Sequence, residues 1–153
     1  IGSVLRYGDV LRMGAGSGVS HSEFNHSADE TVHFLQIWLF PDQENIAPSY
    51  QETNFSPEDK RGQLRLIASP DGAEGSLLIH QDARIYATIL DGAQRLNHTL
   101  ASGRGAYVQV ARGQLQVKGI TLEAGDALQV SDESQLTLEN GNDAEVLVFD
   151  LAL

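Results

Sequence analysis

Two side chains that could act together in chemistry are His21 and Glu23, which follow a glycine-rich stretch from Gly14 to Gly18. In an extended strand, residues i and i+2 point to one face, with Cα atoms roughly 6 to 7 Å apart. We therefore expect both side chains to lie on the same side of one strand and to converge on one ion. Imidazole and carboxylate groups bind divalent first-row metals. The alternative is an exposed polar pair, and two ligands alone are too few for a tight mononuclear site.

The other four histidines are expected to have structural or surface roles. His33 lies within an apolar run, where a buried and hydrogen-bonded imidazole is the expected state. His26 follows an apparent turn and is expected to be exposed. His80 and His98 have no second ligand nearby in the sequence, so we assign them structural roles.

Composition and motifs exclude several classes of function. The chain has no cysteine, so disulfides, thiolate nucleophiles and iron–sulfur clusters are excluded, and any metal must be held by His, Asp or Glu. A net charge of −11 opposes binding to nucleic acid or anionic membranes. Phosphate-loop, nucleophile-elbow and zinc-protease motifs do not occur. The glycine-rich stretch has the wrong spacing for a dinucleotide-binding loop, so we expect a tight turn or bulge there.

The sequence also has no apolar run long enough to span a membrane, and its first residues do not resemble a leader peptide. A cytoplasmic protein is therefore expected.

Most of the chain has the alternation of short strands separated by Gly, Asn, Asp or Pro, which predicts an all-β sandwich or barrel. Lys118-Gly119 and Asn140-Gly141 are predicted to be hairpin turns. The expected strands are 32–40, 77–80, 84–90, 107–111, 115–118, 120–123, 127–130, 136–139 and 145–150. In the first of them, Trp38 and Phe40 are expected to be buried core anchors.

The chain divides into two units at a polar stretch. Residues 1–40 form an N-terminal piece, 41–62 a linker and 63–153 a more complete β unit. We expect the last unit to be a nearly closed antiparallel barrel without bound metal. Forty residues cannot close a barrel alone, so the N-terminal piece must pack on the second unit, on another copy or on a segment outside this chain.

The stretch from Gly8 to Asn25, which contains Gly14-Ala15-Gly16-Ser17-Gly18 and His21-Ser22-Glu23, resembles the second metal-site motif of the pirin family. Residues 33–41 resemble the strand and proline that follow it. Ser69-Pro70-Asp71-Gly72 and the run from Arg112-Gly113 through Gly125-Asp126 resemble the linker and C-terminal cupin of that family. The resemblance implies two jelly-roll β-barrel (cupin) domains, a bicupin whose N-terminal cupin is incomplete here.

The resemblance to bacterial pirin-like quercetinases also implies a function. One divalent metal would be bound by three His and one Glu, with His21 and Glu23 in two of these positions. Iron is expected, with copper, manganese, nickel, cobalt and zinc as alternatives. The metal would orient a deprotonated flavonol, quercetin, for ring-opening dioxygenation, and Glu23 would act catalytically by accepting the hydroxyl proton.

The sequence departs from the family pattern because it contains no His-x-His motif, which supplies the other two ligands in the family. We therefore expect this chain to be the C-terminal portion of a longer quercetin 2,3-dioxygenase, with weak metal binding, absent metal or little turnover by itself. It is expected to pair with the missing N-terminal segment or with a second copy in a homodimer. The alternative is a non-catalytic pirin-like module that binds protein partners, in the manner of a transcription cofactor.

Overall fold

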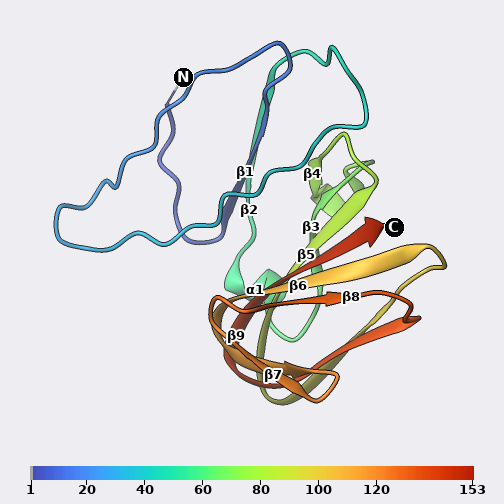
Figure 1. The fold of residues 1–153 in the computed structure, drawn as a ribbon. Helices are drawn as coiled ribbons and strands as arrows, with labels where there is room; N and C mark the ends of the chain where they lie inside the picture. The colour runs from blue at the N-terminus through green and yellow to red at the C-terminus, as the bar shows by residue number, and fades with distance from the viewer. Residues whose placement is uncertain (1) are drawn as a thin grey trace.

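The computed structural model describes residues 2–153, and these form an almost entirely β structure with two parts (Figure 1). We call residues 2–54 the N-terminal unit and residues 63–153 the C-terminal unit. The helix α1 (Pro57–Lys60) lies between them. No helix in this range is both long enough and apolar enough to cross a membrane.

The C-terminal unit is a single sheet with strand order β4-β3-β5-β9-β6-β7, in which β8 also pairs with β6. Neighbouring strands are antiparallel except β3 and β4, which are parallel. The 18-residue β9 lies at the centre and pairs along its length with β5 on one side and β6 on the other. The bounds are β3 Arg65–Ser69, β4 Leu77–Leu78, β5 Ala83–Thr99, β6 Arg104–Val117, β7 Ile120–Glu123, β8 Ala127–Val130 and β9 Gln135–Ala152, with a short 3-10 helix at Ala73–Gly75.

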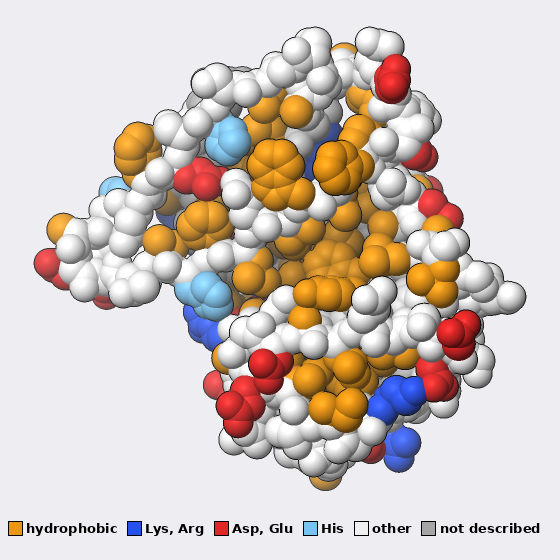
Figure 2. All heavy atoms as spheres, viewed as in Figure 1, with side chains coloured by type: hydrophobic (Ala, Val, Ile, Leu, Met, Phe, Trp, Pro, Cys, Tyr) orange, Lys and Arg blue, Asp and Glu red, His pale blue; other side chains and the backbone are white. Residues whose placement is uncertain are grey.

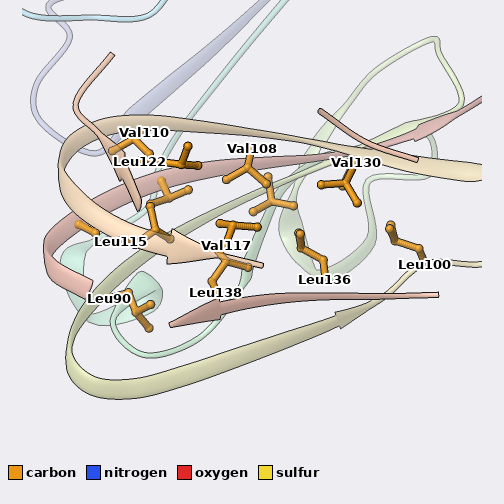
Figure 3. Packing of buried hydrophobic residues seen from close by; sticks show 14 residues of the cluster. Leu90, Leu100, Val108, Val110, Leu115, Val117, Leu122, Val130, Leu136 and Leu138 are labelled. Carbon is orange, nitrogen blue, oxygen red and sulfur yellow. The ribbon is translucent and has the colours of Figure 1, made fainter. Parts of the chain in front are cut away.

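The long strands curve around a core of aliphatic side chains (Figure 3). At both ends of β6 and β9 alternate residues point inward, as the alternation in the sequence predicts, and register shifts interrupt this pattern in the middle of the strands. The core contains fourteen buried residues: Leu90, Leu100, Ala106, Val108, Val110, Leu115, Val117, Leu122, Val130, Leu136, Leu138, Ala144, Val146 and Val148. This packing confirms the expected all-β fold for the C-terminal unit.

A second cluster of buried side chains joins the two units. Phe55, which is 2% exposed, packs with residues of β3, β4 and β5 and with Phe149 of β9. Val10 and Leu39 of the N-terminal unit pack against the same cluster. The burial of these side chains holds the N-terminal unit to the outer face of the sheet.

The N-terminal unit contains one two-stranded antiparallel sheet. Strand β1 (Asp9–Gly14) pairs with β2 (Ser49–Asn54), from Asp9 opposite Asn54 to Gly14 opposite Ser49. Residues 15–48 form a long loop without helix or strand between these ends (Figure 1). Neither strand was among those predicted from the sequence, and β2 and α1 both lie within the expected linker 41–62.

One predicted strand and one predicted hairpin turn are not present in the structure of residues 2–153. Residues 32–40 are irregular, because no strand within residues 2–153 pairs with them and an isolated strand leaves its backbone groups without partners. Asn140-Gly141 lies inside β9 rather than in a hairpin turn. The pairing of β9 with β5 shifts register at this point, and β9 continues beyond it. The predicted turn at Lys118-Gly119 is confirmed, since it separates β6 from β7.

Candidate metal centre

His21 and Glu23 lie close together in the long loop, although not in a strand. The distance from His21 Nε2 to Glu23 Oε1 is 3.9 Å. Both side chains are about half exposed, at 43% and 48%. The prediction that one strand positions them is therefore wrong, whereas the convergence of the two side chains agrees with the expectation.

The glycine-rich stretch forms a tight turn before this pair, as predicted. The amide of Gly18 donates to the carbonyl oxygen of Ala15 at 2.8 Å. Gly16 has a φ of +51°, and a Cβ atom there would lie 2.2 Å from the carbonyl oxygen of Ile46. Because only glycine fits this approach, Gly16 allows the two ends of the loop to come together beside the β1–β2 sheet.

The remaining histidines are distributed across the molecule. His26 is exposed in a surface turn, as predicted, but His33 is also exposed, and the prediction of its burial is wrong. His80 is half-buried, and its carbonyl oxygen accepts a hydrogen bond from the amide of Asp42 at 2.7 Å. His98 lies in the C-terminal unit, 2.7 Å from a carboxylate oxygen of Asp150.

The donor set for a metal is therefore incomplete. Across residues 2–153, no group of three or more His, Cys, Asp or Glu side chains is arranged to hold an ion. One imidazole and one carboxylate suit a divalent first-row metal in chemistry, but a stable mononuclear site needs at least three protein ligands. His21 and Glu23 fit such an ion as two of its ligands. Further ligands would have to come from outside residues 2–153.

The loop that carries the pair also exposes large apolar side chains. Phe24, Trp38 and Phe40 are 87%, 81% and 83% exposed, so the prediction that the last two are buried anchors is wrong. Figure 2 shows apolar side chains gathered in a hollow on this face of the molecule. Trp38 and its neighbours border a groove of about 290 Å³ whose other side is formed by residues of β6 and β9. The groove is lined by Leu35, Gln36, Ile37, Trp38, Leu39, Tyr107, Gln109, Leu147, Phe149 and Leu151.

A polar cluster that the sequence did not predict joins the N-terminal unit to the C-terminal unit. The ammonium group of the buried Lys60 lies 3.1 Å from Glu145 Oε1, and the hydroxyl of Tyr7 donates to the same oxygen at 2.9 Å. Burial and the hydrogen bond to Glu145 raise the pKa of Tyr7 to about 12. Tyr7 and Glu145 are 138 residues apart, so no local spacing could have indicated their contact.

Comparison with known proteins places these features in one family. A family model described as pirin matches residues 2–39, and one described as the quercetinase C-terminal cupin domain matches residues 66–151. The quercetin 2,3-dioxygenase of Escherichia coli K12 is 35% identical over 144 residues, which are 94% of this chain and 61% of that protein. A putative quercetin 2,3-dioxygenase of Pseudomonas aeruginosa is 37% identical over 146 residues, covering 95% of this chain and 62% of the relative.

Solved structures agree with the sequence comparison. YhhW from Escherichia coli has a TM-score of 0.89 and 34% identity, with 96% of this chain and 62% of YhhW covered. A structure of bacterial pirin YhhW in complex with nickel(II) has a TM-score of 0.87 and 34% identity, and the match covers 95% of this chain and 62% of that one. The chain thus spans about three fifths of the length of these relatives. With both parts of the sequence matched and the fold shared, the chain belongs to the pirin family of cupin proteins.

Proposed function

We propose that this chain supplies part of a metal-dependent dioxygenase that opens the flavonol ring of quercetin, with His21 and Glu23 as two ligands of one divalent metal. The observation that carries the proposal is the convergence of these two side chains in the loop after the glycine turn. Relatives that are 35% identical are named quercetin 2,3-dioxygenase, and a nickel complex of a related pirin supports a divalent metal. Iron is the metal we expect, among the several that these ligands accept.

Each residue has a separate role in the proposed reaction. A bound divalent metal would supply Lewis acidity and hold the flavonol oxygens in place. His21 would be a neutral nitrogen ligand. Glu23, whose carboxylate is about half exposed, is accessible to a flavonol hydroxyl and would accept its proton. The exposed aromatic side chains of the same loop, among them Phe24 and Trp38, are suited to contact a planar aromatic substrate.

The proposal includes a division of the chain and a partner. Residues 1–40 would be the remainder of an N-terminal cupin, 41–62 a linker and 63–153 the C-terminal cupin. The two missing ligands would come from a further segment of a longer chain. The partner would be that segment or a second copy of this chain in a homodimer. The exposed apolar side chains of residues 32–40 support a covering partner, because such a surface is unfavourable in water.

Nickel(II) binding to the chain, measured by isothermal titration calorimetry, tests the ligand assignment. We expect weak binding that His21→Ala and Glu23→Gln each reduce about tenfold or more, because each removes one of two ligands. His26→Ala is the matched control, since His26 is an exposed histidine of the same loop. Equal affinity in His21→Ala and His26→Ala would contradict the assignment.

A second function is supported by the same apolar surface. A non-catalytic pirin-like module would use the exposed side chains of residues 32–40 to bind a protein partner and would need no complete metal site. Oxygen consumption with quercetin distinguishes the two functions. It is measured on metal-loaded protein of the relatives' full length, with His21→Ala as the inactive control.

A further inference from the structure

Lys60, the last residue of α1, is buried in the contact between the units. Its side chain is only 5% exposed, and its ammonium group lies 3.1 Å from Glu145 Oε1 on β9. The backbone is fixed as well, because the hydroxyl of Thr88 on β5 donates to the carbonyl oxygen of Lys60 at 3.3 Å. A capping box formed by Ser56 and Asp59 begins the helix. A buried ammonium group requires a partner of opposite charge, and here that partner is Glu145.

Tyr7 contacts the same ion pair from the N-terminal unit. Its hydroxyl donates to Glu145 Oε1 at 2.9 Å. Its ring lies 4.7 Å from the Lys60 ammonium group and 5.5 Å from the Arg112 guanidinium group, distances at which cation–π attraction operates. One tyrosine thus contacts an anion through its hydroxyl and two cations through its ring.

The contacts of Tyr7 continue directly into the β1–β2 sheet. The next residue, Gly8, accepts a hydrogen bond from the amide of the buried Phe55 at 2.8 Å. The side-chain amide of Asn54, at the end of β2, donates to Tyr7 O at 3.3 Å and to Asp9 Oδ1 at 2.6 Å. Tyr7 is therefore tied to the end of the sheet that lies nearest to Lys60 and Glu145.

The other end of the sheet forms the base of the loop with His21 and Glu23. The last pair of the ladder, Gly14 opposite Ser49, brackets loop residues 15–48. A two-stranded sheet is only marginally stable by itself in water, so its position depends on what it is attached to. The attachments at the Tyr7 end therefore act together with the packing of Val10 and the hydrogen bond from the Leu78 amide to Gln51 Oε1 at 3.0 Å to hold the base of the loop.

We propose that Tyr7, Lys60 and Glu145 form a positioning cluster that holds the β1–β2 sheet on the C-terminal unit and so fixes the base of the loop with His21 and Glu23. The part that concerns His21 and Glu23 rests on the proposed function. The C-terminal cupin thereby supports the candidate metal site without contributing a ligand to it.

Amide hydrogen exchange of the whole chain, in wild type and in Tyr7→Phe, tests the cluster. The substitution removes one hydroxyl and keeps the ring. We expect exchange to quicken about tenfold in residues 9–14 and 49–54 and to stay unchanged in β6 and β9, because only the attachment of the sheet is weakened. Tyr107→Phe is the matched control, since Tyr107 lies on β6 outside the cluster.

Unchanged exchange in Tyr7→Phe, or an equal increase in both units, would overturn the proposal. A second variant, Lys60→Met combined with Glu145→Gln, removes both charges of the buried pair together. Only Arg112, which lies 4.0 Å from Glu145 and is 55% exposed, loses an ionic partner, and the variant should reproduce the same regional pattern. Faster exchange in residues 9–14 in this variant supports the cluster, whereas unaltered exchange there would overturn it.

Nickel(II) titration of Tyr7→Phe tests the link to the metal site. We expect the affinity to fall several-fold while His21 and Glu23 are intact. An affinity equal to that of wild type, together with faster exchange in the sheet, would overturn the link to the site. Wild-type protein without His21-dependent nickel binding would instead refute the proposed function, and the exchange experiment would still decide whether the cluster holds the sheet.

Discussion

The imidazole of His98 on β5 and the carboxylate of Asp150 on β9 lie 2.7 Å apart, measured from Nε2 to Oδ2. Asp150 is buried, and its other oxygen forms an ion pair with Arg104 of β6. Arg104 also pairs with Asp82 at 2.9 Å. One carboxylate therefore connects the three longest strands of the C-terminal cupin, and this histidine has the structural role that its isolation in the sequence suggested.

Replacing Asp150 with Asn should destabilise the protein by about 3 kcal/mol, because Arg104, whose side chain is 13% exposed, would lose its buried charged partner and keep only the mostly exposed Asp82. Urea denaturation followed by circular dichroism measures this change. The control is Glu139→Gln, which breaks the pair between Glu139 and the mostly exposed Arg95, and should change the free energy of unfolding by less than about 1 kcal/mol. Equal effects of the two substitutions would contradict the prediction.

Tyr7 should titrate at higher pH than an ordinary tyrosine. Its pKa is raised from 10.0 to about 12, so the neutral hydroxyl is favoured in the folded state. The resulting stabilisation is fully present below pH 10 and is lost as the pH rises through about 12. Ultraviolet absorbance of tyrosinate, compared between wild type and Tyr7→Phe, isolates this group from the other three tyrosines. A difference curve centred near pH 10 would show that the bond to Glu145 is absent.

Gly16 and Gly18 offer a matched pair of substitutions in the glycine turn. A Cβ atom at Gly16 would lie 2.2 Å from the Ile46 carbonyl oxygen, whereas one at Gly18 would meet no atom within 4 Å. Both residues have positive φ, but the φ of Gly16, +51°, lies in the left-handed region that Ala adopts at modest cost, whereas the φ of Gly18, +127°, is rare for any residue but glycine. Backbone strain is therefore no smaller in Gly18→Ala, and faster cleavage in Gly16→Ala reports the clash. Limited proteolysis within residues 15–48 should be about tenfold faster in Gly16→Ala than in Gly18→Ala. Equal cleavage rates would show that the base of the loop is not held closed at Gly16.

This chain should associate in solution, because Trp38 and Phe40 expose most of their surface. Light scattering over a concentration series should show a homodimer, and replacing both residues with Ser should weaken association about tenfold or more. Ile120→Ser is the control, since Ile120 is an exposed apolar residue of β7 in the C-terminal cupin. A wild-type chain that stays monomeric at high concentration would contradict the prediction.

Local signals in the sequence predicted the C-terminal unit well. Strands 120–123 and 127–130 are observed with the predicted bounds, because short alternating runs between turn residues depend mainly on their immediate neighbours. The prediction for Asn140-Gly141 is wrong because its backbone preference for a turn is overridden by pairing on both sides of β9.

Features that depend on distant partners were not predictable from local patterns. The apolar alternation of residues 32–40 predicts a strand, yet a strand requires a partner that the described residues do not provide. The contact between His21 and Glu23 was predictable because the two residues are close in the sequence. The contact between Tyr7 and Glu145 was missed because 138 residues separate the two side chains.

The central position of β9 has a consequence for how the protein is made. Both of its neighbours, β5 and β6, precede it in the chain, and it is the strand that joins them. During synthesis on the ribosome, β5 and β6 emerge before the strand that lies between them, and their inner edges stay open until β9 is released. The cupin therefore assembles late and through contacts far apart in the chain, which is typical of slow-folding β proteins, and until then its open strand edges are prone to aggregation.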